Sequence, residues 1–371
     1  MRKQVNIAIL TNDLGGGTGN HLLSLLKHWD KSVWKTDIFS SSPVRDRVVP
    51  DVPVHYLPPS DVFRFYPVAQ ARYLALLNKS MKRNRPHIVH AYFFWSIIYG
   101  RILKWGGKIS TLVENREDQG FDWGWHEYTW LRKTNFLPDK IICVSEAVKN
   151  VVIDREGIEG SRIAVIHNGV DGNHPPSGKQ ADTRRELGFR EDHLICGMVA
   201  NYNRPVKGVA NFLEAIPAIL SAVPSARFLF VGGGGEENVL KDKAKTLGID
   251  PYVVFAGYRK DIHRYYEIMD ISVLTSFSEG LSLTILESMC YGIPVVATRV
   301  GGNPEVVVEG ETGYLVPLKD NRTLVERIVR LLQDRNIRIA MGEEGRRQVE
   351  QKFRMRDVAG RYLDIYKGLI H

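Results

Sequence analysis

The sequence predicts an α/β protein of two domains, each a parallel β-sheet covered by helices on both faces. The 371 residues are enough for two domains of ordinary size. Short apolar runs, typical of buried parallel strands, alternate with helical segments in both halves. Between the halves, residues 172–182 are polar and rich in proline and glycine. That composition is typical of an interdomain linker.

The first half begins with a strand at residues 5–10, a glycine loop and a helix at about 20–29. Further strands of this half are expected at residues 36–40, 88–91, 109–113, 140–144 and 163–166. The second half repeats the pattern, with strands at 194–200, 227–232, 252–256, 271–275, 294–298 and 314–316. Helices follow at 320–333 and 335–352, and then an aromatic helix with Tyr362 and Tyr366. A site is expected in the loops at the carboxyl ends of these strands.

The composition is typical of a soluble globular protein, with 44% hydrophobic and 25% charged residues. No apolar run approaches the length of a transmembrane helix, and the run at residues 5–10 is too short for a signal peptide. Cys143, Cys196 and Cys290 are scattered, in apolar surroundings and without metal-ligand spacing. We therefore expect a reduced, cytoplasmic protein.

The net charge of +8 is unevenly distributed, because residues 61–110 hold nine Lys or Arg and one acid beside ten aromatic residues. A helix is expected here, with basic residues on one side and apolar residues on the other: Arg72, Lys79, Lys82, Arg83 and Arg85 against Leu74, Leu77 and Met81. Such a segment suits an anionic membrane surface, on the inner face of the membrane for a cytoplasmic protein. A solvated face over a core is the alternative and the commoner outcome. Nucleic acid is disfavoured because no recognisable binding module accompanies the charge.

The glycine loop near the N-terminus could let a backbone approach a phosphate or a sugar. Its spacing, Gly15-x-Gly17-x-x-Asn20, lacks the third glycine of the dinucleotide fingerprint. The strand at residues 36–40 ends in a serine instead of the acidic residue that would bind a ribose. A nicotinamide-dependent enzyme is therefore disfavoured.

Residues 278–287, with the sequence SEGLSLTILE, read as a loop and the first turns of a helix after a buried strand. Glu287 lies five residues beyond Ser282, roughly 7 Å along the helix axis. Because a helix N-terminus favours an anion, a diphosphate there would leave Glu287 placed to bind ribose hydroxyls. Glu279, in the loop, could hold hydroxyls of an attached sugar. An ordinary strand–helix unit with two surface glutamates is the alternative.

Arg204 and Lys207 lie three residues apart in the loop after the strand at 194–200. Two cations at that position could bind a diphosphate and stabilise it as a leaving group. A charged surface turn is the alternative. The glycines at 232–235 lack the Lys-Ser/Thr ending of a P-loop and are interpreted as a strand-to-helix turn.

Several motifs together resemble the retaining glycosyltransferases of family 4, also called glycosyl transferases group 1. They are Arg204-Pro-Val-Lys207-Gly, the segment from Glu279 to Glu287, Gly292-Ile-Pro-Val-Val-Ala-Thr-Arg-Val-Gly-Gly-Asn-Pro-Glu305 and Glu311-Thr-Gly-Tyr-Leu-Val-Pro317. The N-terminal glycine loop, Val144-Ser-Glu-Ala-Val-Lys149 and His167-Asn-Gly-Val-Asp171 continue the match. The resemblance spans essentially the whole chain and is densest in the C-terminal half.

This resemblance implies the GT-B fold, two Rossmann-like domains facing across a cleft. Residues 1–178 would form the acceptor domain, with the C-terminal helix at 353–371 packing back on it. Residues 179–352 would bind the nucleotide sugar. The implied reaction moves a sugar from a UDP- or GDP-sugar to a glycan or lipid-linked acceptor with retention of configuration, in surface polysaccharide or glycolipid synthesis.

The resemblance also implies roles for individual residues. Arg204 and Lys207 would bind the donor diphosphate, Glu287 the ribose and Glu279 the donor sugar, so Glu279, Arg204 and Lys207 are the implied catalytic residues. The donor site would be completed by Gly280, Leu281, Ser282 and Leu283 at the sugar and phosphate, by the loop with Tyr258 and Arg259 at the base, and by Gly16 and Gly17 over the diphosphate. No Asp-x-Asp pair occurs in the sequence, so no metal and no cofactor are expected.

The sequence departs from many relatives after the strand at 109–113, where they carry a histidine near the donor sugar. Here it reads Glu114-Asn-Arg-Glu-Asp118, closer to the arginine–aspartate stretch of another subset of the family. Asn115 and Arg116 are candidates for contact with the sugar or acceptor. His90 either faces the acceptor or is a core histidine at a strand end. Two other functions stay open: a GT-B sugar-nucleotide epimerase and a non-catalytic nucleotide-sugar-binding protein.

Overall fold

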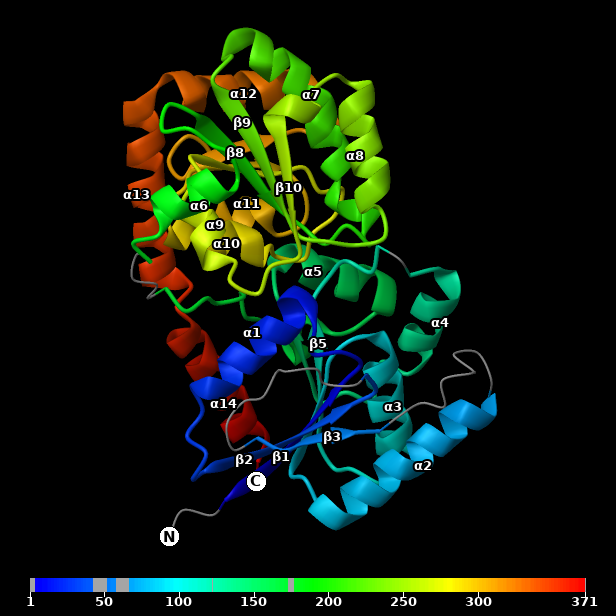
Figure 1. The fold of residues 1–371 in the computed structure, drawn as a ribbon. Coiled ribbons are helices and arrows are strands. Elements are labelled where there is room, and N and C mark those ends of the chain that lie inside the picture. Colours follow the sequence, from blue (N-terminus) through cyan, green and yellow to red (C-terminus); the bar gives the residue numbers. More distant parts are fainter. Residues whose placement is uncertain (1–3, 43–51, 58–66, 122, 173–176, 371) are drawn as a thin grey trace. The chain divides into compact units, whose positions relative to one another are not determined.

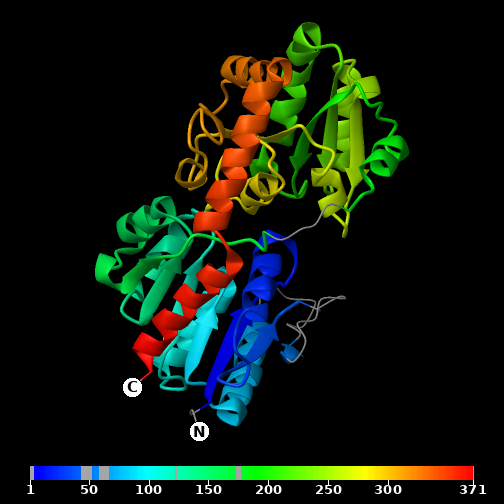
Figure 2. The same ribbon diagram turned by 90° about the vertical axis from the view of Figure 1, so that its left-hand side faces the viewer.

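The computed structural model describes residues 4–42, 52–57, 67–121, 123–172 and 177–370. The chain forms two compact units (Figures 1 and 2). Unit 1 consists of Met1–Gly169 and Met355–His371, and unit 2 of Val170–Arg354. The chain enters unit 2 earlier than the expected boundary at 178/179. Val170 already belongs to unit 2, because its N–H donates to the Phe353 carbonyl at 2.9 Å and it forms an isolated parallel β-bridge with Arg354. Residues 173–176 of the expected linker lie outside the described residues, and Gln180 already begins a helix.

The sheet of unit 1 is parallel and has the strand order β3-β2-β1-β4-β5-β6-β7. Its strands are β1 (Val5–Thr11), β2 (Trp34–Ser40), β3 (Val54–Tyr56), β4 (Ile88–Ala91), β5 (Leu112–Arg116), β6 (Lys140–Cys143) and β7 (Ile163–Val165). The helices are α1 (Gly16–Lys27), α2 (Pro67–Asn84), α3 (Phe94–Trp105), α4 (Trp125–Lys133), α5 (Glu146–Val151) and α14 (Met355–Leu369). A π-helical turn, Val152–Glu156, follows α5.

The strands of unit 1 bury both faces, as expected of a sheet covered by helices on each side. Along β1, Ile7 and Ile9 pack into one core together with α1 and α14. Ala8 and Leu10 point to the other core, which α2, α3 and α4 complete. This alternation is the period of two that a strand imposes. Figures 1 and 2 both show α14 beside α1.

Unit 2 has a second parallel sheet, with the order β10-β9-β8-β11-β12-β13. Its strands are β8 (Leu194–Val199), β9 (Ala226–Val231), β10 (Val253–Gly257), β11 (Ile271–Leu274), β12 (Val295–Thr298) and β13 (Gly313–Val316). The helices are α6 (Gln180–Glu186), α7 (Val209–Ala222), α8 (Glu237–Thr246), α9 (His263–Tyr266), α10 (Leu283–Cys290), α11 (Asn303–Val306), α12 (Asn321–Gln333) and α13 (Arg335–Lys352). One core is filled from α7, α8, α12 and α13, and the other contains Tyr265 and Tyr266 of α9. The predicted fold class, α/β with two parallel sheets, is confirmed.

The structure differs from the prediction in the following places. The edge strand β3 was not expected, because it has three residues and a histidine in the middle. Helix α1 begins at Gly16, so the glycines form its first turn. The strand expected at 109–113 runs instead from Leu112 to Arg116, where Asn115 pairs with Ile142 and Arg116 with Cys143. Polar side chains can lie in this central strand because each has a buried partner.

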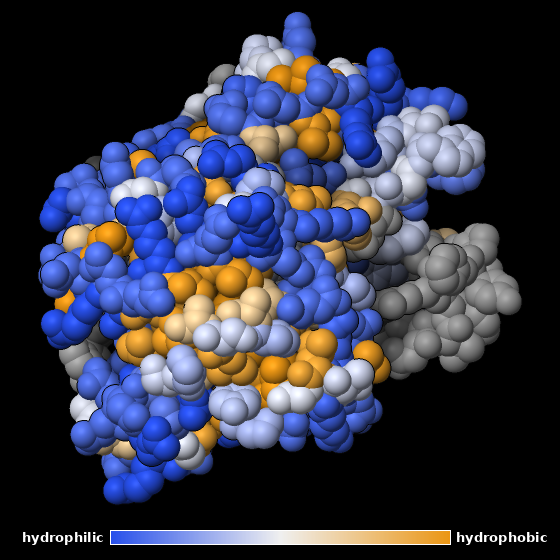
Figure 3. All heavy atoms as spheres, turned by 90° about the horizontal axis from the view of Figure 1, so that it is seen from above, coloured by the Kyte–Doolittle hydropathy of each residue, from blue (hydrophilic) through white to orange (hydrophobic). Residues whose placement is uncertain are grey.

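The surface in Figure 3 is largely hydrophilic, with apolar side chains gathered in a band between hydrophilic ones. Among the described residues, no helix has both the length and the apolar character that crossing a bilayer requires. The amphipathic helix predicted over the basic segment is α2, which buries Tyr73, Leu77 and Met81 and exposes Arg72, Lys79, Lys82 and Arg83. Residues 61–66 of that segment lie outside the described residues.

Candidate functional site

The candidate site lies at the carboxyl edge of the unit 2 sheet. Strands β8 and β11 are neighbours there, although they are not consecutive in the chain. The connection from β8 runs to β9 on one side, and that from β11 runs to β12 on the other. In open α/β sheets, ligands bind at this reversal of strand order. The loop with Arg204 and Lys207 follows β8, and the loop with Glu279 follows β11, so the fold brings both predicted groups to one place.

Backbone contacts join these two loops. Gly208 adopts φ +65°, and a Cβ there would lie 2.0 Å from the Thr275 carbonyl oxygen, so only glycine allows the approach. The Thr275 hydroxyl donates to the Gly208 carbonyl at 2.7 Å, and the Phe277 N–H donates to the Val206 carbonyl at 2.7 Å. The loop after β8 is therefore fixed against the loop after β11, on both sides of Lys207.

Lys207 and Glu279 form an ion pair between the loops. The Lys207 Nζ lies 2.7 Å from Glu279 Oε1 and 3.0 Å from Oε2. The buried Ser276 hydroxyl donates to Glu279 Oε1 at 2.6 Å. The Glu279 side chain is only 7% exposed, whereas that of Lys207 is 22% exposed. The Glu279 carboxylate is thus buried against Ser276, whereas the Lys207 ammonium group is partly open to solvent.

Glu287 lies in the second turn of α10, as predicted. The phenol of Tyr266, from α9, donates to Glu287 Oε2 at 2.7 Å. Burial raises the pKa of the Glu287 carboxyl, and the Tyr266 hydrogen bond partly offsets that rise. Burial, together with the adjacent carboxylate, raises the pKa of Tyr266 well above its ordinary value. The phenol therefore stays protonated and acts as a donor to Glu287.

The start of α10 supplies the other residues predicted around the sugar and phosphate. The Gly280 carbonyl accepts from the Gly302 N–H at 2.9 Å, which ties this loop to the one after β12. Leu281 is 4% exposed and Ser282 is the N-cap residue, but its side chain makes no capping hydrogen bond. Leu283 is the first helical residue. Arg204, partly buried, precedes the 3-10 turn Pro205–Lys207.

The loop predicted to contact the base follows β10. The Gly257 carbonyl accepts from the Gly232 N–H at 2.9 Å, so the loop lies beside the glycine turn after β9. Tyr258 is 62% exposed. Arg259 is bound within its own unit, because its Nε donates to the Ala256 carbonyl at 2.8 Å and its guanidinium lies 5.7 Å from the Tyr265 ring centroid. Base contact by Tyr258 and Arg259 stays a prediction.

In unit 1, the predicted glycines are at the start of α1. Gly16 has φ +65°, and the N–H of Gly15, the N-cap residue, donates to the Asp13 carboxylate at 2.9 Å. Gly16 and Gly17 are exposed, and a Cβ on Gly16 would meet no atom within 4 Å. The space above Gly16 is open within this unit. Contact with a diphosphate stays a prediction for both glycines.

His90 lies in the core of unit 1, with no exposed surface. Its Nδ1 is 2.6 Å from the Tyr366 hydroxyl of α14, and its ring lies 4.5 Å from that of Tyr92 between centroids. Burial lowers the pKa of His90 to about 3, so the ring is neutral. Of the two alternatives for His90, these surroundings are those of a core histidine; contact with an acceptor stays a prediction.

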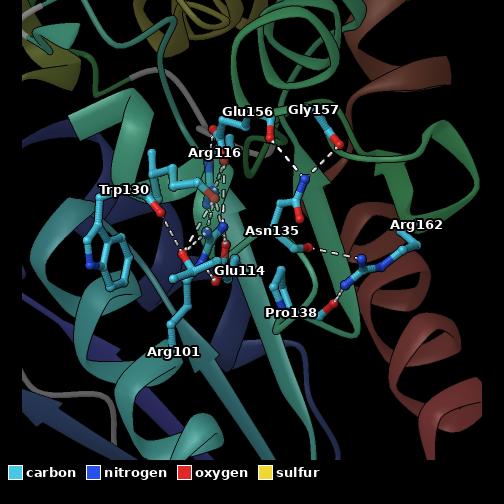
Figure 4. Close-up of polar contacts among 11 residues, drawn as sticks. Arg101, Glu114, Arg116, Trp130, Asn135, Pro138, Glu156, Gly157 and Arg162 are labelled. Carbon is cyan, nitrogen blue, oxygen red and sulfur yellow. Dashed lines mark hydrogen bonds and ion pairs between the residues drawn. The ribbon is translucent and has the colours of Figure 1, made fainter. Parts of the chain in front are cut away.

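Arg116 belongs to a buried network of two arginines and two glutamates (Figure 4). Its Nε and Nη2 donate to the two oxygens of Glu156 at 3.0 and 2.8 Å, and Nη2 also donates to Glu114 at 2.9 Å. Arg101 donates to both Glu114 oxygens, at 2.7 and 2.8 Å. Burial raises the pKa of Glu114, but Arg101 and Arg116 outweigh it and hold that pKa below its ordinary value.

Asn115, between the two network residues on β5, points to the opposite face of the sheet. It is 1% exposed, accepts from the Tyr362 hydroxyl at 3.2 Å and donates to the Glu117 carboxylate. Burial raises the pKa of Glu117 to about 7. Asn115 and Arg116 therefore anchor β5 within unit 1. A contact with sugar or acceptor stays a prediction for both.

Two residues of the site were not singled out from the sequence, Ser276 and Tyr266. Ser276 is the second residue after β11, and its position three residues before Glu279 is the kind of spacing that could have indicated a partner. Tyr266 belongs to a four-residue helix with no periodic pattern. Its contact with Glu287 depends on tertiary packing, and no sequence signal would have found it.

Comparison with known proteins gives two family models. The model described as Glycosyl transferases group 1 matches residues 179–348, and the one described as Glycosyltransferase Family 4 matches residues 15–174. Between them they cover most of the chain, and each falls largely within one structural unit.

Curated relatives include the N-acetyl-alpha-D-glucosaminyl L-malate synthase of Bacillus anthracis, 31% identical over 56% of this chain. They also include the UDP-Gal:alpha-D-GlcNAc-diphosphoundecaprenol alpha-1,3-galactosyltransferase of Escherichia coli, 26% identical over 80% of this chain and 79% of the relative. The match spans only 54% of the Bacillus anthracis protein, about half of its length.

Among solved structures, Anabaena Alr3699/HepE in complex with UDP and glucose has a TM-score of 0.86 at 20% identity, covering 98% of this chain and all of that one. Sucrose-phosphate synthase from Thermosynechococcus elongatus has a TM-score of 0.85, also at 20% identity, over 99% of each chain. These likenesses support the fold, two Rossmann-like domains of the GT-B type. With both halves matched by their models, the chain belongs to the family 4 glycosyltransferases.

Proposed function

We propose that this protein transfers a sugar from a nucleotide-sugar donor, a UDP- or GDP-sugar, to a glycan or lipid-linked acceptor. The observation that carries the proposal is the Lys207–Glu279 pair just before the start of α10, with Glu287 in the second turn of that helix. The names of relatives support the substrate classes: the Escherichia coli relative is named for UDP-Gal and a diphosphoundecaprenol-linked acceptor, and a Staphylococcus aureus relative for capsular polysaccharide biosynthesis. Surface polysaccharide or glycolipid synthesis is therefore the proposed role.

In the proposed donor complex, the diphosphate binds to Arg204 and Lys207. An ammonium group has three N–H donors. Two of those of Lys207 point to Glu279, so the third is available to a phosphate oxygen. Glu287 accepts from the ribose, and Glu279 from hydroxyls of the sugar. The backbone of residues 280–283 lies along the sugar and phosphate, and the loop after β10 lies at the base.

In the proposed reaction, the bond between the sugar C1 and the diphosphate oxygen breaks while an acceptor hydroxyl oxygen bonds to C1. The acceptor proton passes to the departing diphosphate, which assists an attack from the same face and so retains the configuration. The cations at 204 and 207 stabilise the negative charge that develops on the leaving group. We propose that they do so without a metal ion.

The test is a thermal-shift panel of UDP-, GDP- and ADP-sugars, followed by transfer assays with and without EDTA. One class of donor should raise the melting temperature, and the shift should disappear in Glu287→Ala. The matched control is Glu326→Ala on α12, an exposed glutamate that pairs with Arg322 and should keep the full shift. Activity should survive EDTA, and a strict metal requirement would contradict the proposed role of the cations.

The assay also separates transfer from the alternatives. A transferase forms product only when acceptor is added, whereas an epimerase interconverts the free donor. A non-catalytic binding protein would show the melting shift and neither reaction. Interconversion without acceptor, or no shift with any donor, would overturn the proposed function.

We further propose that unit 1 docks on an anionic membrane surface. Trp105 at the end of α3 is 69% exposed and Phe136 is 61% exposed, and their rings lie 6.4 Å apart between centroids. Ile102, one turn before Trp105, is 38% exposed. Helix α2, whose basic side is exposed, packs on the same face of the sheet as α3. Exposed aromatic rings and exposed lysine and arginine side chains, both present in unit 1, suit the headgroup region of a bilayer.

A further inference from the structure

Tyr266 is buried beside the candidate ribose-binding carboxylate. It is 1% exposed, and its hydroxyl donates to Glu287 Oε2 at 2.7 Å. Tyr266 comes from α9, before β11, whereas Glu287 comes from α10, after it. The contact therefore joins two segments on either side of the strand that leads to the site. It is a side-chain contact made across the core, with one partner uncharged and the other a carboxylate.

The position of the phenol is fixed by its surroundings. The Tyr266 ring stacks on that of Tyr291, with centroids 5.4 Å apart and planes within 14°. Tyr291 is held in turn, because its hydroxyl lies 2.7 Å from His263 Nδ1 at the start of α9. This packing holds the ring with its hydroxyl beside Glu287. The donor is thus in place before any ligand arrives.

A glutamate carboxyl group turns freely about its last torsion unless a partner fixes it. The 2.7 Å bond from Tyr266 engages Oε2 and so sets the plane of the group. Ribose offers two neighbouring hydroxyls, and a carboxylate whose plane is fixed can meet them without losing rotational freedom on binding. The same bond favours the ionised form, which burial alone disfavours. Both effects improve Glu287 as an acceptor.

We propose that Tyr266 is a positioning residue of the donor site, which holds one oxygen of Glu287 so that the carboxylate meets the ribose diol of the nucleotide. This inference rests on the proposed function, since it takes Glu287 as the ribose ligand. Tyr266 itself touches neither the sugar nor the diphosphate in this scheme. Its contribution is confined to the recognition of the ribose hydroxyls.

The test measures nucleotide affinity by isothermal titration in the wild type and in Tyr266→Phe, which keeps the ring and removes the hydroxyl. The probe is whichever of UDP, GDP and ADP binds the wild type most tightly, compared with its 2′,3′-dideoxy form. Loss of a hydrogen bond to a charged group should weaken binding of the ribonucleotide about tenfold. The dideoxy nucleotide lacks the ribose diol, so both proteins should bind it equally.

Tyr314→Phe is the matched control, because Tyr314 is also a buried tyrosine of unit 2 but lies on β13, at the edge of the sheet. It should bind both nucleotides as the wild type does. Equal weakening of both nucleotides in Tyr266→Phe would show a general structural effect and overturn the inference, as would unchanged binding of the ribonucleotide. If no nucleoside diphosphate binds the wild type, the proposed function fails first. A loss of binding in Glu287→Ala with none in Tyr266→Phe overturns this inference alone.

Discussion

Lys207 donates to both carboxylate oxygens of Glu279, at 2.7 and 3.0 Å, across two loops that follow neighbouring strands. The pair brings together a cation proposed for the diphosphate and an acid proposed for the sugar. Each group neutralises the other before substrate binds, so neither is left buried as an isolated charge.

Removing either member of this pair should lower both stability and activity, whereas removing both should lower activity with less loss of stability than the two single changes predict. Lys207→Met leaves Glu279, 7% exposed, without its cation, and Glu279→Gln leaves Lys207 without its acid. In urea unfolding followed by far-ultraviolet circular dichroism, the double variant should be more stable than the sum of the single changes predicts, by about 1–3 kcal/mol. The transfer rate should stay at least about 100-fold below that of the wild type in all three variants. Additive stabilities, or activity restored in the double variant, would count against this role.

Arg101 should be among the most important residues for the stability of unit 1. It is fully buried and also donates to the Leu131 carbonyl and the Thr134 hydroxyl, at 2.7 and 2.8 Å. Arg101→Met leaves Glu114 and Glu156 with one arginine between them, and should destabilise the unit by about 3–5 kcal/mol.

Tryptophan fluorescence during urea unfolding measures this loss selectively, because all seven tryptophans, at positions 29 to 130, belong to unit 1. The control is Arg322→Met on α12, where the exposed ion pair with Glu326 should contribute less than about 1 kcal/mol. An Arg101→Met unfolding curve that coincides with the wild type would show that the network contributes no net stability.

Glu117 should make the stability of unit 1 depend on pH. Burial raises the pKa of its carboxyl from the ordinary 4.5 to about 7, while an Asn115 hydrogen bond opposes the rise and Asp118 adds to it. Between these two values the folded state holds a proton that the unfolded state has released. The unfolding free energy contributed by this group therefore falls as the pH rises through that window, and its stabilising effect is absent above it.

Glu117→Gln removes this dependence, because glutamine does not titrate. Relative to the wild type, the variant should gain stability between about pH 5 and about pH 8, measured by tryptophan fluorescence in urea. Glu159→Gln, an exposed change in the same unit, should follow the wild type at every pH. A constant difference between Glu117→Gln and the wild type would refute the shifted titration.

Reversing charges on α2 should weaken binding to anionic membranes. Each basic residue near such a surface contributes about 1 kcal/mol, so Arg72→Glu, Lys79→Glu and Arg83→Glu together should lower affinity for phosphatidylglycerol vesicles at least roughly 100-fold. The charge-matched control reverses Lys241, Lys243 and Lys245 of α8 in unit 2. Equal vesicle flotation of the two triple variants would contradict the membrane proposal. The double variant Trp105→Ser, Phe136→Ser should also weaken vesicle binding, and this loss should be the same at low and at high salt, because it removes apolar contacts and not charges.

The strands of the sheets could be predicted because most are short, continuous apolar runs, such as the one now seen at Val295–Thr298. The strand that contains Arg116 could not be bounded in this way. Its charged end is buried only because Glu114 and Glu156 compensate it, and Glu156 comes from a π-helical turn 40 residues later. Residue preference reports the cost of burying a charge but not the presence of a distant partner.

The candidate site was predictable to the same extent. Spacing, and the rule that loops at one sheet edge converge, nominate Arg204, Lys207, Glu279 and Glu287 as candidates. The direct bond between Lys207 and Glu279 depends on β8 and β11 being neighbours, which follows only from the strand order. His90 has the polar character of a site residue, yet Tyr366, 276 positions away, makes it part of the core.

The packing of α14 into unit 1 has a consequence for how the protein is made. Met355, Val358, Ala359, Tyr362 and Tyr366 belong to the same buried cluster as Ile7, Ile9 and Leu22. A ribosome synthesises the chain from its N-terminus, so all of unit 2 emerges before these five side chains can reach their places. Until then, the face of β1 that α14 will share stays incompletely covered. Unit 2 can therefore finish folding first, although the sequence of unit 1 begins first. The apolar core of unit 1 stays partly exposed until α14 has been synthesised and packs against it.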